Sequence, residues 1–188
     1  MDSDSTKKTL GILVGSLRRE SYCKKVAEHL SGLLGAQFDI RFISLSDLSI
    51  YNQDFDTPEN TPEAWQIFRM SVKTSGAILL VTPEYNRSIP PVLKNALDIA
   101  SRPAGENVWS GKPAAIVSVS PGRIGGFGAN HHLRQVSSFL NLYVMNQPEM
   151  YMGDIARMLG TEGIEDEKTQ QYLQDFAKAF SDWIEAFN

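Results

Sequence analysis

The sequence predicts an α/β fold, in which a doubly wound, five-stranded parallel sheet carries helices on both of its faces. Short apolar runs alternate along the chain with longer amphipathic stretches, the pattern of buried parallel strands that are each followed by a covering helix. The 188 residues also fit a single domain, which can bury a sizeable core without disulfides or a structural metal.

The expected elements alternate in chain order. Short runs rich in Val, Ile and Leu predict strands over 9–14, 38–43, 77–81, 114–119 and 143–145. Amphipathic stretches predict helices over 22–34, 62–75, 90–100, 129–140 and 168–187.

Turn and cap residues place several of these boundaries. Gly15 permits a tight turn after the first strand, and Ser21 can cap the helix that begins near Tyr22. Pro83 ends the third strand, and the proline pair at 90–91 opens the next helix, where a missing N–H does no harm.

The last helix has the clearest period. Its aromatic residues are spaced by four, four, three and four positions, so they share one face: Tyr172, Phe176, Phe180, Trp183 and Phe187. We predict that this stripe packs into the core.

Composition restricts the class of protein. The formal net charge of −4 gives no reason to expect nucleic acid or an anionic membrane as a partner. No apolar run approaches the roughly 20 residues that span a bilayer. A single Cys fits a reducing compartment, so we expect a cytoplasmic protein. The polar start, MDSDSTKK, is expected to form a disordered tail over residues 1–7 and not a signal peptide.

In a sheet of this kind ligands bind outside the carboxyl ends of the strands. The loop after the first strand, VGSLRRES at 14–21, offers the hydroxyls of Ser16 and Ser21 and the guanidinium of Arg18 or Arg19 beside a helix N-terminus. These groups suit an anion, although an ordinary capped turn with two solvated arginines would use the same residues. The glycine patterns of dinucleotide sites and P-loops are absent, which favours a terminal monophosphate such as that of FMN.

The loops after the third and fourth strands are equally unusual. In the first of these, Tyr85 and Asn86 form an exposed turn, and backbone amides between Glu84 and Ser88 are predicted to face the edge of a flat heterocycle. In the second, four glycines between Pro121 and Ala129 would let the backbone approach or cover a planar ligand. Taken singly, the loop after the third strand could be only a turn with an exposed Tyr, and the loop after the fourth strand could be only a flexible surface loop.

The chain resembles the NADPH-dependent FMN reductases of flavodoxin-like fold, a family that includes bacterial quinone and chromate reductases. Three stretches carry the resemblance, in the order and at the spacing usual for the family: GSLRRES at 15–21, TPEYNRSIPPVLKNALD at 82–98, and GKPAAIVSVS through GG to HHLRQ at 111–135.

The resemblance implies bound FMN, NADPH or NADH as hydride donor, a small-molecule electron acceptor, and a homodimer or homotetramer. The phosphate would be held by Ser16, Arg18, Ser21, Tyr22 and Cys23. The isoalloxazine would be lined by Pro83, Glu84, Tyr85 and Asn86, with Ser120 and Gly122 along its pyrimidine side.

Two positions depart from or vary within the family pattern. Cys23 stands where Asn is common, and a thiol is a much weaker hydrogen-bond partner than an amide; we therefore expect no side-chain contribution from it. Arg87 either adds positive charge at the mouth of the site or is solvated.

The three histidines do not predict a metal site. His131 and His132 are neighbours on one helix and project about 100° apart, while His29 lies on another helix.

The expected reaction transfers a hydride from NAD(P)H to FMN and then passes electrons to a quinone, flavin, azo compound or metal oxyanion. The cofactor performs this chemistry, so no catalytic residue is nominated. The alternative is a flavodoxin-like single-electron carrier, against which the modest charge and the second loop weigh. A phospho-accepting signalling domain would need an Asp after the third strand, where this chain has Thr82 and Pro83.

Residues 145–152, MNQPEMYM, gather apolar and aromatic groups just past the last strand. A monomer would leave such groups exposed, so this segment, with Glu149 and Tyr151, is the expected subunit interface.

Overall fold

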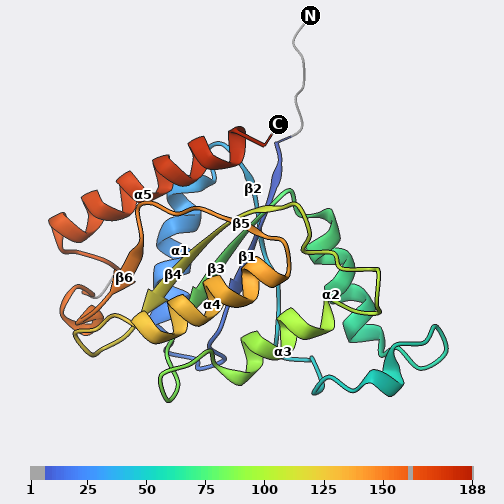
Figure 1. Ribbon diagram of the computed structural model, residues 1–188. Helices are drawn as coiled ribbons and strands as arrows, with labels where there is room; N and C mark the ends of the chain where they lie inside the picture. Colours follow the sequence, from blue (N-terminus) through green and yellow to red (C-terminus); the bar gives the residue numbers. More distant parts are fainter. Residues whose placement is uncertain (1–6, 161–162, 188) are drawn as a thin grey trace, which may run out of the picture.

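The computed structural model describes residues 7–160 and 163–187, which form one sheet with helices on both faces (Figure 1). Its parallel strands are β1 (Thr9–Val14), β2 (Asp39–Phe42), β3 (Ala77–Thr82), β4 (Pro113–Val119) and β5 (Tyr143–Val144). Their order is β2-β1-β3-β4-β5, the order of flavodoxin-like sheets. The predicted fold class is confirmed.

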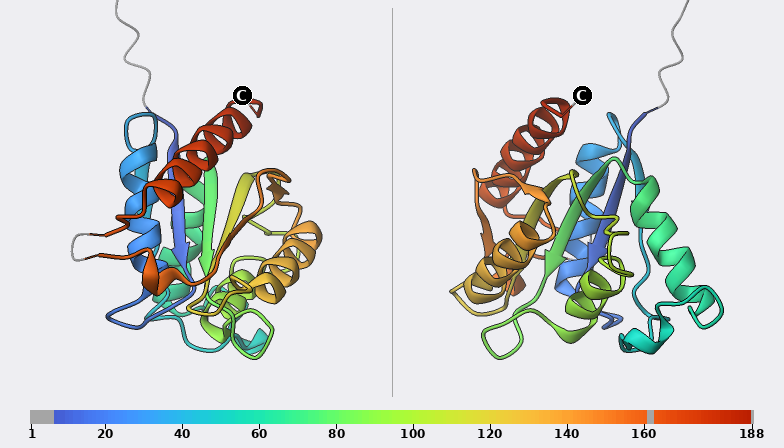
Figure 2. Two further views of the ribbon diagram at one scale, coloured as in Figure 1. Left: turned by 90° about the vertical axis from the view of Figure 1, so that its left-hand side faces the viewer. Right: turned by 45° about the vertical axis from the view of Figure 1, so that its right-hand side comes forward.

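The helices form two layers (Figure 2). One layer consists of α1 (Tyr22–Leu34) and α5 (Glu167–Glu185). The other consists of α2 (Glu63–Thr74), α3 (Pro91–Ile99) and α4 (Phe127–Phe139). A hydrophobic core lies between the sheet and each helix layer. Because successive side chains of a strand point to opposite faces of the sheet, β1 and β3 contribute side chains to both of these cores.

The two cores divide the side chains of one strand between them. In β3, Leu79 packs with α1 and α5, whereas Ile78 and Leu80 pack with α2, α3 and α4. All six residues of β3 are buried, as expected for a central parallel strand.

The chain contains a sixth strand, β6 (Met150–Met152), that the sequence did not predict. β5 pairs with the start of β4, at Pro113 and Ala114, and β6 pairs with its end, from Val117 to Val119. The edge of the sheet is therefore one strand interrupted by residues 145–149. The segment MNQPE hides the continuation because it contains a proline and polar residues.

Boundaries of most other elements shift by one or two residues from those predicted. α4 begins at Phe127, two residues early, because Gly126 adopts a left-handed φ of 76° as its N-cap. The aromatic stripe on α5 is core only in its middle: Phe176 and Phe180 are buried, whereas Tyr172 and Phe187 are exposed.

The predicted disordered tail over 1–7 lies outside the described residues except for Lys7. The Lys7 ammonium donates to the carbonyl of Gly35 (3.2 Å).

Candidate functional site

The three loops singled out from the sequence meet at the carboxyl edge of the sheet, the lower edge in Figure 1. Val14 pairs with Val81, and Thr82 pairs with Ser118. β1, β3 and β4 therefore end side by side, and the loops that follow them start from neighbouring points.

Gly15 lets the first two loops approach each other. A Cβ at this position would lie 3.1 Å from Cγ of Pro90 and 3.3 Å from Cδ of Pro83. Gly15 does not adopt a positive φ, so the need for glycine is steric rather than conformational, in contrast to the tight turn expected. The prolines of the second loop thus fix the position of the first.

The first loop ends at the N-terminus of α1. The Lys24 N–H donates to Oγ of Ser21 (3.3 Å), which confirms Ser21 as the N-cap. Helix N–H groups in the first turn have no intrahelical acceptor, and those of Tyr22 and Cys23 find none elsewhere in the described residues. They remain available to an external anion.

Ser16 and Arg18 extend this set of donors. The Ser16 hydroxyl is half-buried and has no partner within residues 7–160 and 163–187. The Arg18 guanidinium lies 5.5 Å from the centre of the Tyr22 ring and donates to the carbonyl of Glu20. One hydroxyl, one guanidinium and a helix N-terminus therefore converge, and these donors fit a phosphate monoester.

The Cys23 side chain is buried and lies beside the Ser21 hydroxyl. The thiol is buried among core residues of β1 and α1, and this burial raises its pKa to about 12. The thiol therefore stays protonated and uncharged near neutral pH.

The second loop contains a tight turn. The N–H of Tyr85 donates to the carbonyl of Ser88 (3.0 Å), and the N–H of Ser88 donates to that of Tyr85 (2.9 Å). Asn86 and Arg87 have φ values of 50° and 67°, as in a type I′ turn.

This turn corrects the expectation that all amides from Glu84 to Ser88 face a ligand. Those of Tyr85 and Ser88 are used within the turn. The amides of Glu84, Asn86 and Arg87 have no acceptor in the described part of the chain and are the donors left for a ligand. The Tyr85 ring is 48% exposed and borders the turn.

Glu84 connects the second and third loops. Its carboxylate accepts from the N–H of Ala129 (3.1 Å) in the first turn of α4 and from Nη1 of Arg87 (3.3 Å). A carboxylate at this position complements the helix dipole. The Glu84 side chain thus binds the N-terminus of α4. The backbone of Glu84 is the part of this residue that can line a ligand.

The glycines of the third loop serve close packing. A Cβ on Gly125 would lie 2.8 Å from the Tyr151 backbone, and one on Gly128 would lie 2.8 Å from the Arg87 carbonyl oxygen. The Ser118 hydroxyl donates to the Gly125 carbonyl (2.7 Å). The loop is packed against β6 and the second loop, in contrast to the flexible or swinging segment considered from the sequence.

Ser120 and Gly122 lie together at the start of this loop. The N–H of Gly122 donates to Oγ of Ser120 (3.0 Å), and the carbonyl of Gly122 accepts from the N–H of Gly125 (3.3 Å). Gly122 is exposed. Both residues border the same edge of the sheet as the other two loops.

The histidines lie apart. His131 Nε2 lies 3.0 Å from the Tyr151 hydroxyl, and His132 Nδ1 lies 2.9 Å from the Ser88 hydroxyl. His29 lies on α1, where its Nε2 is buried without a hydrogen-bond partner. In the described ranges no three His, Cys, Asp or Glu side chains gather into a metal-binding group.

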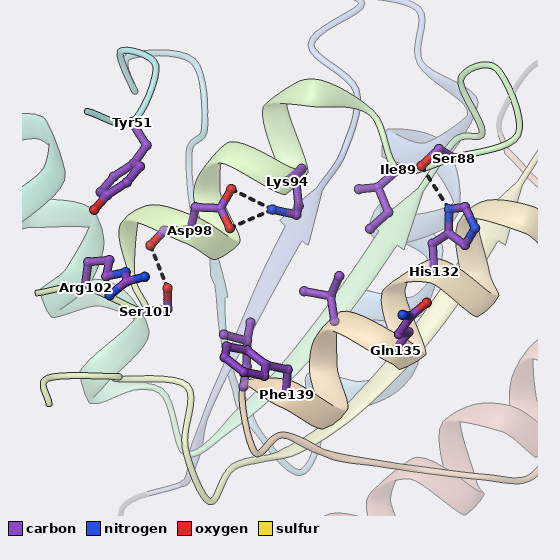
Figure 3. Close-up of a pocket in the computed structure, with 12 residues that line it drawn as sticks. Tyr51, Ser88, Ile89, Lys94, Asp98, Ser101, Arg102, His132, Gln135 and Phe139 are labelled. Carbon is purple, nitrogen blue, oxygen red and sulfur yellow. Dashed lines mark hydrogen bonds and ion pairs between the residues drawn. The ribbon is translucent and has the colours of Figure 1, made fainter. Parts of the chain in front are cut away.

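A groove of about 700 Å³ runs between α3 and α4 (Figure 3). Ser88 and His132 are hydrogen-bonded at the end next to the second loop, and Phe139 lies at the other end. Lys94 and Asp98 form an ion pair along it (2.7 Å). The sequence did not predict this groove, because its lining residues are far apart in the chain.

The sequence also missed the network that anchors the long segment between β2 and α2. Asp56 accepts from Nη2 of Arg69 (2.8 Å) and from the Tyr51 hydroxyl (2.7 Å). Asn95 of α3 accepts from the N–H of Tyr51 (2.8 Å) and donates to the carbonyl of Ser49 (3.0 Å). This network holds Tyr51 at the groove.

Comparison with known proteins identifies the family. The family model for NADPH-dependent FMN reductases matches residues 8–156. A quinone reductase of Pseudomonas putida is 48% identical over 176 residues, which are 94% of each chain. A 2-hydroxy-1,4-benzoquinone reductase of a Burkholderia species is 44% identical over 93% of this chain and 95% of its own.

A solved structure agrees with these matches. FerB, a flavoenzyme NAD(P)H:(acceptor) oxidoreductase from Paracoccus denitrificans, superposes with a TM-score of 0.90 at 38% identity, over 96% of this chain and 98% of its own. These matches show that this chain belongs to the NADPH-dependent FMN reductase family.

Proposed function

We propose that this chain oxidises NAD(P)H and reduces a quinone by means of bound FMN. The observation that carries the proposal is the set of donors at the first loop. The Ser16 hydroxyl and the N–H groups of Tyr22 and Cys23 have no hydrogen-bond acceptor among the described residues, and the Arg18 guanidinium, which donates to the Glu20 carbonyl, adds a positive charge. Bound FMN would supply the hydride and electron chemistry. The protein residues hold, orient and shield it.

Each loop has a separate task in this proposal. The first loop binds the phosphate through charge-assisted hydrogen bonds. The backbone of Pro83, Glu84 and Asn86 lines one edge of the ring, and Ser120 and Gly122 lie along its pyrimidine side. The Tyr85 ring shapes the opening through which a substrate reaches the ring. This division of tasks requires no acid, base or nucleophile from the protein.

Quinones are proposed as the acceptor class because two relatives that each match more than 90% of this chain are named as quinone reductases. A quinone is planar and conjugated, so it can stack on an open ring face bordered by Tyr85. Chromate, azo compounds and free flavin are included as competing acceptors in the test below.

The proposal is tested with purified protein reconstituted with FMN. We expect a yellow protein that consumes NADPH or NADH stoichiometrically with added benzoquinone, and that uses quinone with a higher kcat/KM than chromate, azo dye or free FMN. Protein that retains FMN but oxidises neither nucleotide would contradict a reductase and support a single-electron carrier.

We also propose that two copies of the chain associate through the α3–α4 groove. In the segment 145–152 the methionines Met145, Met150 and Met152 are buried in the core of one chain, while Glu149 and Tyr151 stay half-buried. Phe139, at the end of the groove, is instead 90% exposed. An aromatic ring so exposed is typical of an interaction surface when it borders a cavity, and a second copy supplies a matching ring by two-fold symmetry.

A cytoplasmic location is proposed on the evidence of the single Cys. Across the part of the chain that the structure describes, no helix combines the length and the apolar character needed to cross a membrane.

A further inference from the structure

The carboxyl edge of the sheet is rich in positive charge, although the chain as a whole is acidic, with a formal net charge of −4. Four arginines and two glutamates lie in the three loops of this edge, at 15–21, 82–90 and 120–126. Both glutamates have cationic partners: Glu20 lies 3.7 Å from Lys25, and Glu84 lies 3.3 Å from Arg87. The edge therefore presents an excess of positive charge, which attracts anions.

Two of these arginines belong to the loops that line the flavin ring in the proposed function. Arg87 follows Asn86 in the second loop, and Arg123 follows Gly122 in the third. The Arg87 side chain is 74% exposed. Arg123 is exposed, and its side chain has no ion-pair or hydrogen-bond partner among residues 7–160 and 163–187. Both guanidinium groups are thus available to a molecule that approaches the open ring face.

The turn that carries Arg87 is held against α4 at several points. The Ser88 hydroxyl lies 2.9 Å from Nδ1 of His132 (Figure 3). The Glu84 carboxylate accepts from the N–H of Ala129 (3.1 Å). These contacts lie on either side of Arg87, so its guanidinium extends from a fixed backbone.

Arg87 occupies a backbone position that favours glycine. Its φ is 67°, and it is the second central residue of the type I′ turn, where glycine is preferred. A side chain in the left-handed region is unfavourable relative to glycine. Residues held in such conformations cluster at functional sites, so the strained position of Arg87 points to a function for its side chain.

We propose that Arg87 and Arg123 select electron acceptors that combine a planar conjugated ring with a negative charge, such as quinones that carry a sulfonate, a carboxylate or an ionised hydroxyl. The proposal rests on the proposed function and names the subclass of quinone. The quinone ring stacks on the open face beside Tyr85, and its anionic substituent faces a guanidinium. The quinone gains two electrons, which NAD(P)H supplies, and two protons, and becomes a hydroquinone. Its charged substituent is unchanged.

A pair of redox-inert probes tests the charge preference without turnover. FMN-loaded protein is titrated by calorimetry with naphthalene-2-sulfonate and with its neutral isostere naphthalene-2-sulfonamide. We expect the sulfonate to bind roughly fivefold more tightly, or better, at about 10 mM ionic strength. The preference should shrink at about 0.3 M, because salt screens exposed charges.

Four variants assign this preference to the two arginines. Arg87→Gly removes the side chain and suits the φ of the turn, and it should lower the preference roughly twofold to fivefold, the range for an exposed ion pair. Arg123→Gln should lower it by a similar factor. The double variant should bind both probes equally, and Arg87→Lys, which keeps the charge, should retain most of the preference.

Lys73→Ala provides a control with the same change of charge, because Lys73 is exposed on the last turn of α2 at the opposite edge of the sheet. This variant should keep the full preference of the natural chain. All proteins are saturated with FMN before the titration, so a difference in flavin content does not enter the comparison.

Stopped-flow mixing extends the test to the reaction in the absence of NADPH. Photoreduced, FMN-loaded protein is mixed with 1,4-naphthoquinone-2-sulfonate or with 1,4-naphthoquinone. The ratio of the two second-order rate constants should fall in Arg87→Gly and in Arg123→Gln and stay unchanged in Lys73→Ala. Comparing this ratio between proteins cancels the difference in intrinsic reactivity between the two quinones.

Equal binding of the two probes by the natural chain would overturn the proposal. So would a preference that survives in the double variant, because it would assign anion binding to other groups, or a rate ratio that neither substitution changes while quinones still reoxidise the protein. If neither quinone reoxidises the photoreduced protein while the sulfonate still binds through Arg87 and Arg123, the proposed function fails and the anion preference stands.

Discussion

Burial determines the chemistry of Cys23. The thiol lies in the core, and loss of solvation raises its pKa to about 12. Since the thiolate is the reactive form, we predict that Cys23 in the folded protein does not react with DTNB near pH 8. The same thiol should react fully once guanidinium chloride unfolds the chain. Rapid stoichiometric reaction of the native protein would show that the side chain faces solvent.

The partly buried imidazole of His29, whose Nε2 atom is fully buried, makes the free energy of unfolding depend on pH. Burial lowers the pKa of His29 below its ordinary value of 6.5, so the unfolded chain binds a proton more readily than the folded chain. The contribution of His29 to the free energy of unfolding is therefore fully present above about pH 6.5. This contribution is lost as pH falls from there toward the lower pKa of His29 in the folded state.

We predict that the free energy of unfolding falls less between about pH 7 and pH 5.5 in His29→Leu than in the natural chain. The substitution removes this imidazole and leaves the rest of the chain unchanged. Urea denaturation at the two pH values measures this difference. Equal losses in the two proteins would mean that His29 is protonated as easily in the folded state as in the unfolded one.

At the scale of an element, the backbone and the side chains of the turn at 85–88 have different tasks. The backbone is expected to hold the flavin, and the Tyr85 side chain is expected only to border it. Asn86 has a φ of 50°, which proline cannot adopt, so Asn86→Pro should distort the turn and abolish FMN retention. Tyr85→Ala keeps both backbone hydrogen bonds of the turn and should retain FMN while changing acceptor preference. The ratio of flavin to protein absorbance after gel filtration measures retention. A colourless Tyr85→Ala beside a yellow, active Asn86→Pro would refute this assignment.

Elements with strong local signals were predictable from the sequence. β1 and α1 have the predicted boundaries, because a buried apolar run is followed directly by a serine cap. β6 was not predictable from the sequence, because three residues give little periodicity. Its pairing also depends on β4, which lies more than thirty positions away in the chain. The Met residues of 145–152 were misread for the same reason: without β6, nothing in the sequence shows what covers them.

The candidate site was predictable as a set of loops but not as a set of contacts. The position of the loops follows from strand order, which fixes where β1, β3 and β4 end. Strand order does not reveal the roles of Gly15, Glu84 and Gly128, because each of these residues contacts a neighbour in another loop. The α3–α4 groove is likewise a product of tertiary packing.

At the scale of the whole molecule, association of two copies should depend on Phe139. Its ring is exposed in the single chain, so Phe139→Glu should disturb the fold little and place a charge at the proposed interface. Light scattering should give about twice 20.9 kDa for the natural chain and a monomer for the variant, with similar melting temperatures. A natural chain that is monomeric at micromolar concentration would contradict the proposed interface.

The central claim is that the first loop binds the FMN phosphate in a reductase of this family. Fluorescence titration of FMN into the natural chain and into Arg18→Ala tests it most directly, with Lys73→Ala as a control. Loss of a charge-assisted phosphate contact costs about 1.5 to 3 kcal/mol, so we predict that the Kd for FMN rises roughly tenfold to a hundredfold in Arg18→Ala and is unchanged in Lys73→Ala. An unchanged Kd in Arg18→Ala would contradict the account.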